Sequence, residues 1–234
     1  MTLLSTRGLT KSFEGLKAVT DVDFDLPHGE VRALIGPNGA GKTTLVSMIC
    51  GRIAPSSGRI TFGGRDITGL PAHKRIALGM AYTFQITSVF PRLDARENVA
   101  LAARRGRKGD TGPAVEAALA RVGLEGRAEQ EAGDLSYGHQ RLLEIAMGLV
   151  QEPRLLILDE PTQGLSEAEI DGFKALIREL AGGTTILLIE HNMRVVMELA
   201  EQVTVLNFGE ILAEGTPAEI HANAAVQAAY LGSG

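Results

Sequence analysis

The segment Gly36–Thr44 constrains the fold of this chain more than any other stretch. It reads Gly-Pro-Asn-Gly-Ala-Gly-Lys-Thr-Thr and matches the pattern G-x-x-x-x-G-K-[ST]. Glycines let backbone N–H groups turn inward around phosphate oxygens, and the positive end of a following helix adds to this attraction. The apolar run Val31–Ile35 precedes the loop, and Leu45–Ile49 continues after it as an apolar helical segment. Strand, glycine loop and helix in this order predict a nucleotide-binding α/β core.

Individual residues of this loop have distinct predicted roles in binding a nucleotide and Mg²⁺. Lys42 is expected to reach the β- and γ-phosphates, and the Thr43 hydroxyl is expected to ligate the metal ion. The full set of loop residues expected to bind the nucleotide is Gly36, Asn38, Gly39, Gly41, Lys42, Thr43 and Thr44.

A second part of the predicted site follows an apolar strand. Leu155–Asp159 is a mostly apolar run that ends in an acid, and Glu160 comes directly after it. An acid at the carboxyl end of a buried strand can hold Mg²⁺ through water, which suits Asp159. Glu160 is then expected to polarise an attacking water molecule. Two ordinary acids that cap a strand are the alternative, which the upstream phosphate loop disfavours.

The segment Leu135–Gln140 predicts a second anion-binding position. Ser136 and Gly138 stand at the expected start of a long helix over 136–150. The first N–H groups of a helix have no partner within the helix, and its dipole attracts negative charge. Because the chain already has a phosphate loop, we expect this helix start to contact a γ-phosphate bound by another copy.

Composition narrows the class of protein. The 234 residues are 44% hydrophobic, which is enough for a large domain with a substantial core. The formal net charge of −5 argues against a nucleic-acid partner. Cys50 is the single cysteine, so we expect no disulfide or cysteine-based metal site. No apolar run approaches the roughly 20 residues that span a bilayer. We therefore expect a cytoplasmic protein that meets a membrane only through a partner.

The order of patterns along the chain predicts one compact unit, 1–234, with an insert. Near-alternating residues over 3–6 and 19–26 predict antiparallel strands. Helices are expected over 94–103, 113–122 and 136–150, and Asp94 is a plausible N-cap for the first. From Arg154 the α/β pattern returns. The expected fold is thus an α/β P-loop NTPase core with an N-terminal antiparallel β subdomain and a helical subdomain at about 92–150.

Taken together, these motifs resemble those of an ATP-binding cassette (ABC) ATPase. The order and spacing agree with that family over Gly36–Thr44, Gln85, Leu135–Gln140, Leu155–Glu160 and His191. In such proteins two cassettes pack head to tail and sandwich two ATP molecules. The resemblance implies that a single chain binds ATP but hydrolyses it poorly.

The resemblance also implies roles for residues outside the phosphate loop. Phe13 is expected to stack on adenine, and Gln85 to touch Mg²⁺ and the attacking water. Ser136 and Gly138 are expected to contact the opposite γ-phosphate. His191 is expected to reach the γ-phosphate and to hold the geometry for hydrolysis.

Three residues depart from the usual ABC pattern. Tyr137 and His139 stand where a glycine and a glutamine are usual, and Ser166 stands where an aspartate is usual. The two expected phosphate contacts, Ser136 and Gly138, are kept. The Ser166 hydroxyl can still cap the next helix.

Several segments are similar to cassettes of branched-chain amino-acid importers. They are Phe13–Val19, Tyr82–Gln85, Tyr137–Ala146, Ile189–Met193, Gly215–Pro217 and Ala229–Gly232. Urea and short-chain amide importers have very similar cassettes, so these solutes remain candidates. Soluble non-transport ABC ATPases are a further alternative, although they usually have two cassettes in one chain or a long coiled-coil insert.

An importer cassette implies a set of partners. These are a second cassette, the same or related, and an integral-membrane permease gripped by the loop Ile86–Leu93 after Gln85. A periplasmic binding protein is also expected in the system. The chain is then expected on the cytoplasmic face of the inner membrane as a peripheral subunit.

Overall fold

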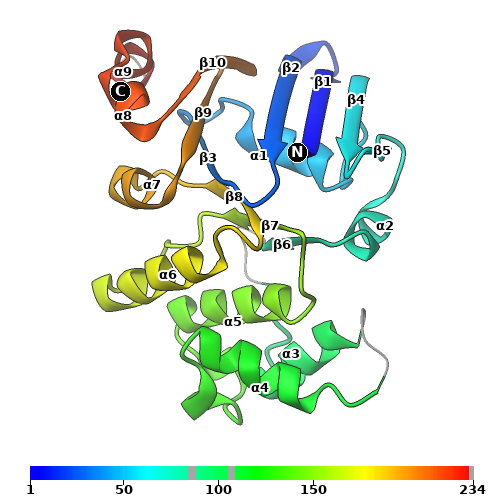
Figure 1. Cartoon of the computed structure of the whole chain (residues 1–234), viewed down its shortest axis with the longest axis vertical. Helices are drawn as coiled ribbons and strands as arrows, with labels where there is room; N and C mark the ends of the chain where they lie inside the picture. Colours follow the sequence, from blue (N-terminus) through cyan, green and yellow to red (C-terminus); the bar gives the residue numbers. More distant parts are fainter. Residues whose placement is uncertain (84–87, 105–108, 232–234) are drawn as a thin grey trace. The chain divides into compact units, whose positions relative to one another are not determined.

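The computed structural model of the chain describes residues 1–83, 88–104 and 109–231. The chain consists of two compact units, and Figure 1 shows the helices and strands of both. The first unit combines Met1–Leu78 with Ala181–Gly234, so both ends of the chain contribute to it. The second unit is the continuous segment Gly79–Leu180.

An antiparallel sheet forms one part of the first unit. Its strand order is β2-β1-β4-β5, with β1 at Thr2–Phe13, β2 at Leu16–Pro27, β4 at Ser57–Phe62 and β5 at Arg65–Asp66. The predicted antiparallel strands are confirmed, but β1 and β2 are longer than their alternating cores. Register shifts along the β1–β2 pair interrupt the alternation, for instance between Thr6 and Leu9, without ending the pairing.

A second sheet region of the first unit is built around the strand that leads into the phosphate loop. β3 (Val31–Ile35) pairs in parallel with β8 (Thr185–Ile189) and with β9 (Gln202–Asn207). β10 (Glu210–Gly215) is antiparallel to β9, and the two strands form a hairpin. Every residue of β3 is buried, as expected for a strand inside a sheet.

Short helices complete the first unit. They are α1 (Lys42–Ile49), α2 (Ala72–Ala77), α7 (Met193–Leu199), α8 (Pro217–Ala222) and α9 (Ala224–Leu231). A core cluster joins β3 and β9 to α7, α8 and α9 through Ala33, Ile35, Val196, Val203, Val205, Ile220 and Val226. Asn223 separates α8 from α9, and its Oδ1 accepts a hydrogen bond from the Ala225 N–H.

The second unit joins a pair of parallel strands to helices. β6 (Met80–Thr83) pairs with β7 (Leu155–Asp159). The helices are α3 (Ala95–Ala103), α4 (Gly112–Arg121), α5 (Tyr137–Leu149) and α6 (Glu167–Leu180), with 3-10 turns at Glu125–Arg127 and Ala132–Asp134. The N-cap predicted at Asp94 is present, in a capping box with Glu97. Ser136, at the predicted start of the long helix, caps α5 by accepting a hydrogen bond from the His139 N–H.

Candidate nucleotide-binding site

The phosphate loop packs closely against neighbouring backbone at two glycines of its sequence pattern, Gly36 and Gly41. A Cβ on Gly36 would lie 2.1 Å from the Leu206 carbonyl oxygen on β9. A Cβ on Gly41 would lie 2.5 Å from the Ala18 carbonyl oxygen, and Gly41 has a φ of +100°. Any side chain at either position would displace the loop from its support. The close packing therefore explains why glycine is needed at both positions.

Lys42 is folded over the loop it terminates. Its Nζ donates to the Gly36 carbonyl oxygen at 2.5 Å and to the Pro37 carbonyl oxygen at 3.0 Å. The side-chain nitrogen is thereby positioned above the loop whose N–H groups a phosphate would meet. Thr43 is exposed and lies in the first turn of α1, where the helix dipole favours an anion.

The remaining loop positions are open to solvent. Asn38 and Gly39 are exposed, and a Cβ on Gly39 would meet nothing within 4 Å. Thr44 is half-buried in α1. The structure thus places all seven predicted loop residues in one loop and helix start.

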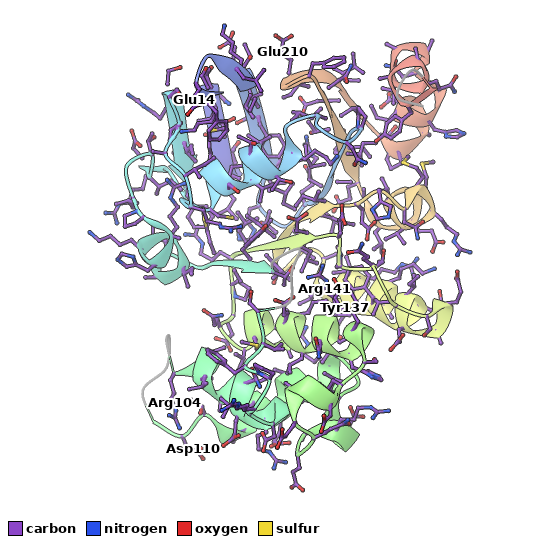
Figure 2. The ribbon with its side chains drawn as sticks, turned by 180° about the vertical axis from the view of Figure 1, so that it is seen from behind. Glu14, Arg104, Asp110, Tyr137, Arg141 and Glu210 are labelled. Atoms are coloured by element: carbon purple, nitrogen blue, oxygen red, sulfur yellow. The ribbon has the colours of Figure 1, made fainter. Side chains whose placement is uncertain are left out.

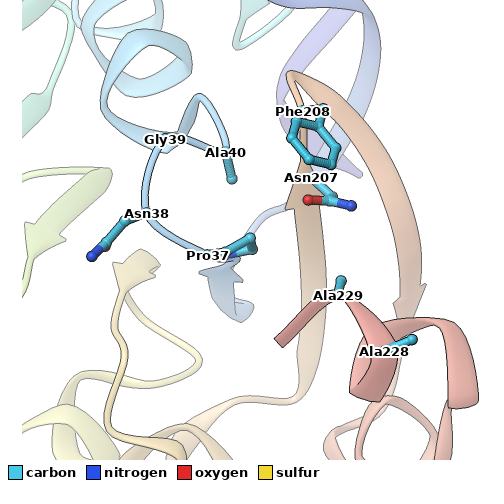
Figure 3. Close-up of a pocket in the computed structure, with 8 residues that line it drawn as sticks. All are labelled: Pro37, Asn38, Gly39, Ala40, Asn207, Phe208, Ala228 and Ala229. Carbon is cyan, nitrogen blue, oxygen red and sulfur yellow. The ribbon is translucent and has the colours of Figure 1, made fainter. Parts of the chain in front are cut away.

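The C-terminal helix α9 lies beside the phosphate loop. A cavity of about 350 Å³ separates the loop, the β9–β10 turn and α9 (Figure 3), and it is lined by Pro37, Asn38, Gly39, Ala40, Asn207, Phe208, Ala228 and Ala229. Burial raises the pKa of the Tyr230 phenol, and a hydrogen bond from the Gly36 N–H to the phenol partly opposes this. The end of the chain therefore contacts the first residue of the loop.

His191 follows β8 on a turn held by a buried carboxylate. Glu190 is 2% exposed, and its Oε2 accepts hydrogen bonds of 3.0 Å from the His191 and Asn192 N–H groups. Asn192 in turn caps α7. This arrangement fixes the backbone of His191 while its side chain remains exposed.

Phe13 ends β1 as an exposed aromatic ring. It is 45% exposed, and the Lys11 Nζ lies 5.0 Å from its ring centroid. An accessible aromatic face with a neighbouring cation can stack on a base and attract phosphate. Because the Phe13 ring lies outside the core, a base can stack on it.

In the second unit, Asp159 ends β7 with its carboxylate held in place. It is 3% exposed, and its Oδ2 accepts a hydrogen bond of 2.9 Å from the Tyr82 hydroxyl. Glu160 follows with a φ of +50°, a left-handed conformation that is strained for a non-glycine residue. The strain turns the chain sharply after the strand, and such strain is concentrated at functional sites.

The start of α5 is packed tightly against the segment before α6. A Cβ on Gly138 would lie 3.0 Å from the Leu165 side chain and 3.1 Å from the Gly164 carbonyl oxygen. Ser136 is exposed at the N-cap. The packing keeps the first turn of α5 against Gly164, in the segment before α6.

One turn further along, α5 contains a buried ion pair. Its carboxylate, Glu144, also binds the segment that follows β6. The Arg141 Nη1 donates to the Glu144 Oε2 at 3.0 Å, and Glu144 also accepts from the Ser88 N–H. Burial raises the pKa of Glu144, and the hydrogen bonds from Ser88 and Arg141 oppose this. Figure 2 shows Tyr137 and Arg141 together on α5, with the guanidinium 5.9 Å from the ring centroid.

Gln85 lies outside the described residues, but part of the loop that follows it is described. Phe90 is 53% exposed, whereas Asn98 on α3 is fully buried. The Asn98 amide accepts from the Phe90 N–H at 2.8 Å and donates to three carbonyls of residues 90, 93 and 94. Asn98 therefore presents Phe90 at the surface.

Sequence reasoning missed several residues that hold the site. No role was predicted for Glu190, Asn98 or Tyr230. The signals for the first two are weak, because a polar residue after a strand or within a helix is usually solvated. Tyr230 lies in Ala229–Gly232, one of the segments similar to cassettes of branched-chain amino-acid importers, but nothing in the sequence indicated its contact with Gly36.

Comparisons with known proteins agree with this geometry. The family model described as ABC transporter matches residues 19–163. A second model, described as branched-chain amino acid ATP-binding cassette transporter, matches residues 210–234. The second match covers β10, α8 and α9, including the helix beside the phosphate loop.

Curated relatives match nearly the whole chain. The chain is 40% identical to the high-affinity branched-chain amino acid transport ATP-binding protein BraF of Pseudomonas aeruginosa, over 98% of each chain. It is 41% identical to the corresponding protein LivG of Salmonella typhimurium, again over 98% of each. A solved ADP conformation of an ATP-binding cassette of an ABC transporter superposes with a TM-score of 0.90 at 27% identity, over 99% of both chains.

Proposed function

Since the chain belongs to the ABC transporter family of ATP-binding cassettes, we propose that it is the ATP-hydrolysing subunit of an importer of branched-chain amino acids. The chain has the ABC ATPase fold and is an ATPase of that family. The observation that supports this solute most directly is the C-terminal family match at residues 210–234, together with relatives of that named activity along the whole chain.

The first unit supplies nucleotide binding. Lys42 binds the β- and γ-phosphates from its position over the loop, and the Thr43 hydroxyl is a ligand of Mg²⁺. Phe13 stacks on adenine, which its exposed ring allows. His191 contacts the γ-phosphate from a turn that Glu190 holds rigid.

The second unit supplies groups for hydrolysis. Asp159 provides a carboxylate for Mg²⁺, whose preference for one or two carboxylates plus phosphates and water suits this residue. Glu160 polarises the attacking water from the sharp turn that follows β7, where its φ is +50°. Gln85 is proposed to contact Mg²⁺ and this water.

ABC cassettes work as dimers with membrane permeases. We propose that Ser136 and Gly138 of this chain contact the γ-phosphate bound by a second cassette. No helix among residues 1–83, 88–104 and 109–231 is both long and apolar enough to cross a bilayer. The loop that presents Phe90 is proposed to contact a cytoplasmic helix of the permease, and a periplasmic binding protein delivers the solute.

A Glu160→Gln variant tests the hydrolytic role. We expect ATP binding to persist, a dimer to accumulate with ATP on size-exclusion chromatography, and turnover to fall by at least about 100-fold, as for loss of a general base. Glu125→Gln, an exposed change in the same unit, is the matched control. Turnover of Glu160→Gln near the wild-type rate would remove Glu160 from this role.

Uptake measurements test the transport role and its solute. A deletion strain is complemented with the wild-type chain or with Glu160→Gln, and the uptake of labelled leucine and labelled urea is followed. We expect only the wild-type chain to restore leucine uptake. Restoration of urea uptake instead would assign the cassette to the urea importers, and restoration of neither would contradict a transport role for these solutes.

A further inference from the structure

The three residues that depart from the usual ABC pattern lie together in the second unit. Tyr137 and His139 are in the first turn of α5, and Ser166 directly precedes α6. A Cβ on Gly164 would lie 2.5 Å from the Tyr137 ring. The aromatic ring therefore lies against the segment that leads into α6.

A chain of polar contacts joins the same two helix starts. The Ser136 Oγ lies 2.8 Å from the His139 Nδ1, and the His139 Nε2 lies 3.4 Å from the Glu169 Oε1. The Glu169 Oε2 accepts hydrogen bonds of 2.7 Å from both the hydroxyl and the N–H of Ser166. The serine expected to contact phosphate is thus connected through His139 to Glu169.

The protonation state of His139 decides what the Ser136 hydroxyl can do. When the ring is neutral and its proton is on Nε2, directed at Glu169, the Nδ1 accepts a hydrogen bond from the Ser136 hydroxyl. In the doubly protonated ring the Nδ1–H donates to the Ser136 Oγ instead. The hydroxyl proton can then turn outward to an anion.

We propose that His139 is a positioning residue, whose protonation releases the Ser136 hydroxyl to donate to the γ-phosphate held by the opposite cassette. This inference rests on the proposed dimeric function and deepens it. It predicts that closure of the ATP-bound dimer takes up protons, because the closed state favours the protonated ring. Acidification should therefore strengthen the dimer until His139 is fully protonated.

Charges around His139 act in opposite directions. Glu169 is the anion that faces the ring, and Ser166 hydrogen bonds lower the pKa of Glu169, with smaller contributions from His139 and Arg127. The carboxylate therefore stays ionised at neutral pH. The positive end of α5 opposes a positive charge on the ring, because His139 lies in the first turn of that helix. A change to Glu169 should accordingly alter the pH response.

The test compares dimer formation with Mg²⁺ and ATP between pH 6.0 and 8.5, in a Glu160→Gln background that prevents turnover. With His139 present, we expect the apparent dimer dissociation constant to fall by about fivefold to tenfold towards acid pH, as one titrating imidazole allows. Adding His139→Gln should reduce this change to less than about twofold. His221→Gln, which removes an exposed histidine of α8, is the matched control and should keep the full response.

A second variant and a second measurement separate positioning from folding. Glu169→Gln removes the facing anion and should move the response to more acid pH. Calorimetry of ATP-driven dimerisation in buffers of different ionisation enthalpy should show proton uptake that His139→Gln abolishes. Equal pH responses with and without His139 would overturn this inference while leaving the proposed function intact. Failure to dimerise with ATP at any pH would instead contradict the proposed function.

Discussion

Replacing Arg75 should destabilise the first unit more than any other single charge change in α2. Arg75 is 1% exposed, and its guanidinium donates to four backbone carbonyls. Two of them, those of Met48 and Ile49 at 2.7 Å, lie at the end of α1. The other two belong to residues 70 and 68, at 2.8 and 3.0 Å. The cation therefore caps the carboxyl end of the helix that begins at the phosphate loop.

The magnitude follows from the four acceptors. Burial lowers the pKa of Arg75, because removing the cation from water costs free energy. Part of the favourable free energy of its four hydrogen bonds offsets this cost. Arg75→Met would leave buried carbonyls without donors, at about 1–3 kcal/mol each before water enters and the chain relaxes. We expect a net loss of about 3–5 kcal/mol, a drop in Tm of about 6–20 °C for a chain of this size. Arg75→Lys should lose about 2 kcal/mol, because an ammonium cannot reproduce the planar fork.

Thermal and urea unfolding followed by circular dichroism would measure these differences. Lys74→Met removes the same charge from an exposed neighbour and should change stability by less than about 0.5 kcal/mol. If Arg75→Met lay within about 1 kcal/mol of the wild-type chain, the four hydrogen bonds would not stabilise the fold as argued. If Arg75→Lys matched the wild-type chain, the planar fork would be irrelevant.

Two further changes test the phosphate loop and the pH dependence of the protein's stability. Gly36→Ala should abolish ATP binding measured by equilibrium titration, because its Cβ would lie 2.1 Å from the Leu206 carbonyl oxygen, whereas Gly39→Ala meets no atom within 4 Å and should retain binding. Hydrogen bonds from Thr216 lower the pKa of Glu219 below the reference value of 4.5, so this carboxylate contributes stability above that pH and loses it as pH falls through its folded-state value. Glu219→Gln, which removes the titrating carboxylate, should therefore flatten the acid limb of the free energy of unfolding measured with urea between about pH 5 and 3, and an unchanged limb would contradict the assignment.

Local chemistry made much of this structure predictable. The residue types at Asp94 and Ser136 are strong N-caps, and both cap the helices expected of them. The glycines and Lys42 identify a phosphate loop because few other structures need that spacing. For the two N-caps, the backbone N–H that the side chain accepts from lies three residues along the chain, at Glu97 and at His139.

Contacts between distant residues could not be predicted in the same way. Arg75 stands in a polar segment next to Lys74 and has the sequence appearance of a solvated residue. His139 and Glu169 are 30 positions apart, and neither position shows that a hydrogen-bonded chain connects them. Burial of a charge depends on which backbone groups converge on it, and that is a property of the tertiary fold.

The placement of β3 has a consequence for synthesis of the protein. Val31–Ile35 pairs with β8 and β9, which begin about 150 residues later in the chain. At a translation rate of about 5–20 residues per second, this apolar strand waits about 8–30 s on the ribosome before either parallel neighbour has been made. During that interval its backbone edges can pair with other chains. A product truncated before residue 185 never acquires these neighbours, so we expect nonsense fragments of this protein to be chaperone and protease substrates.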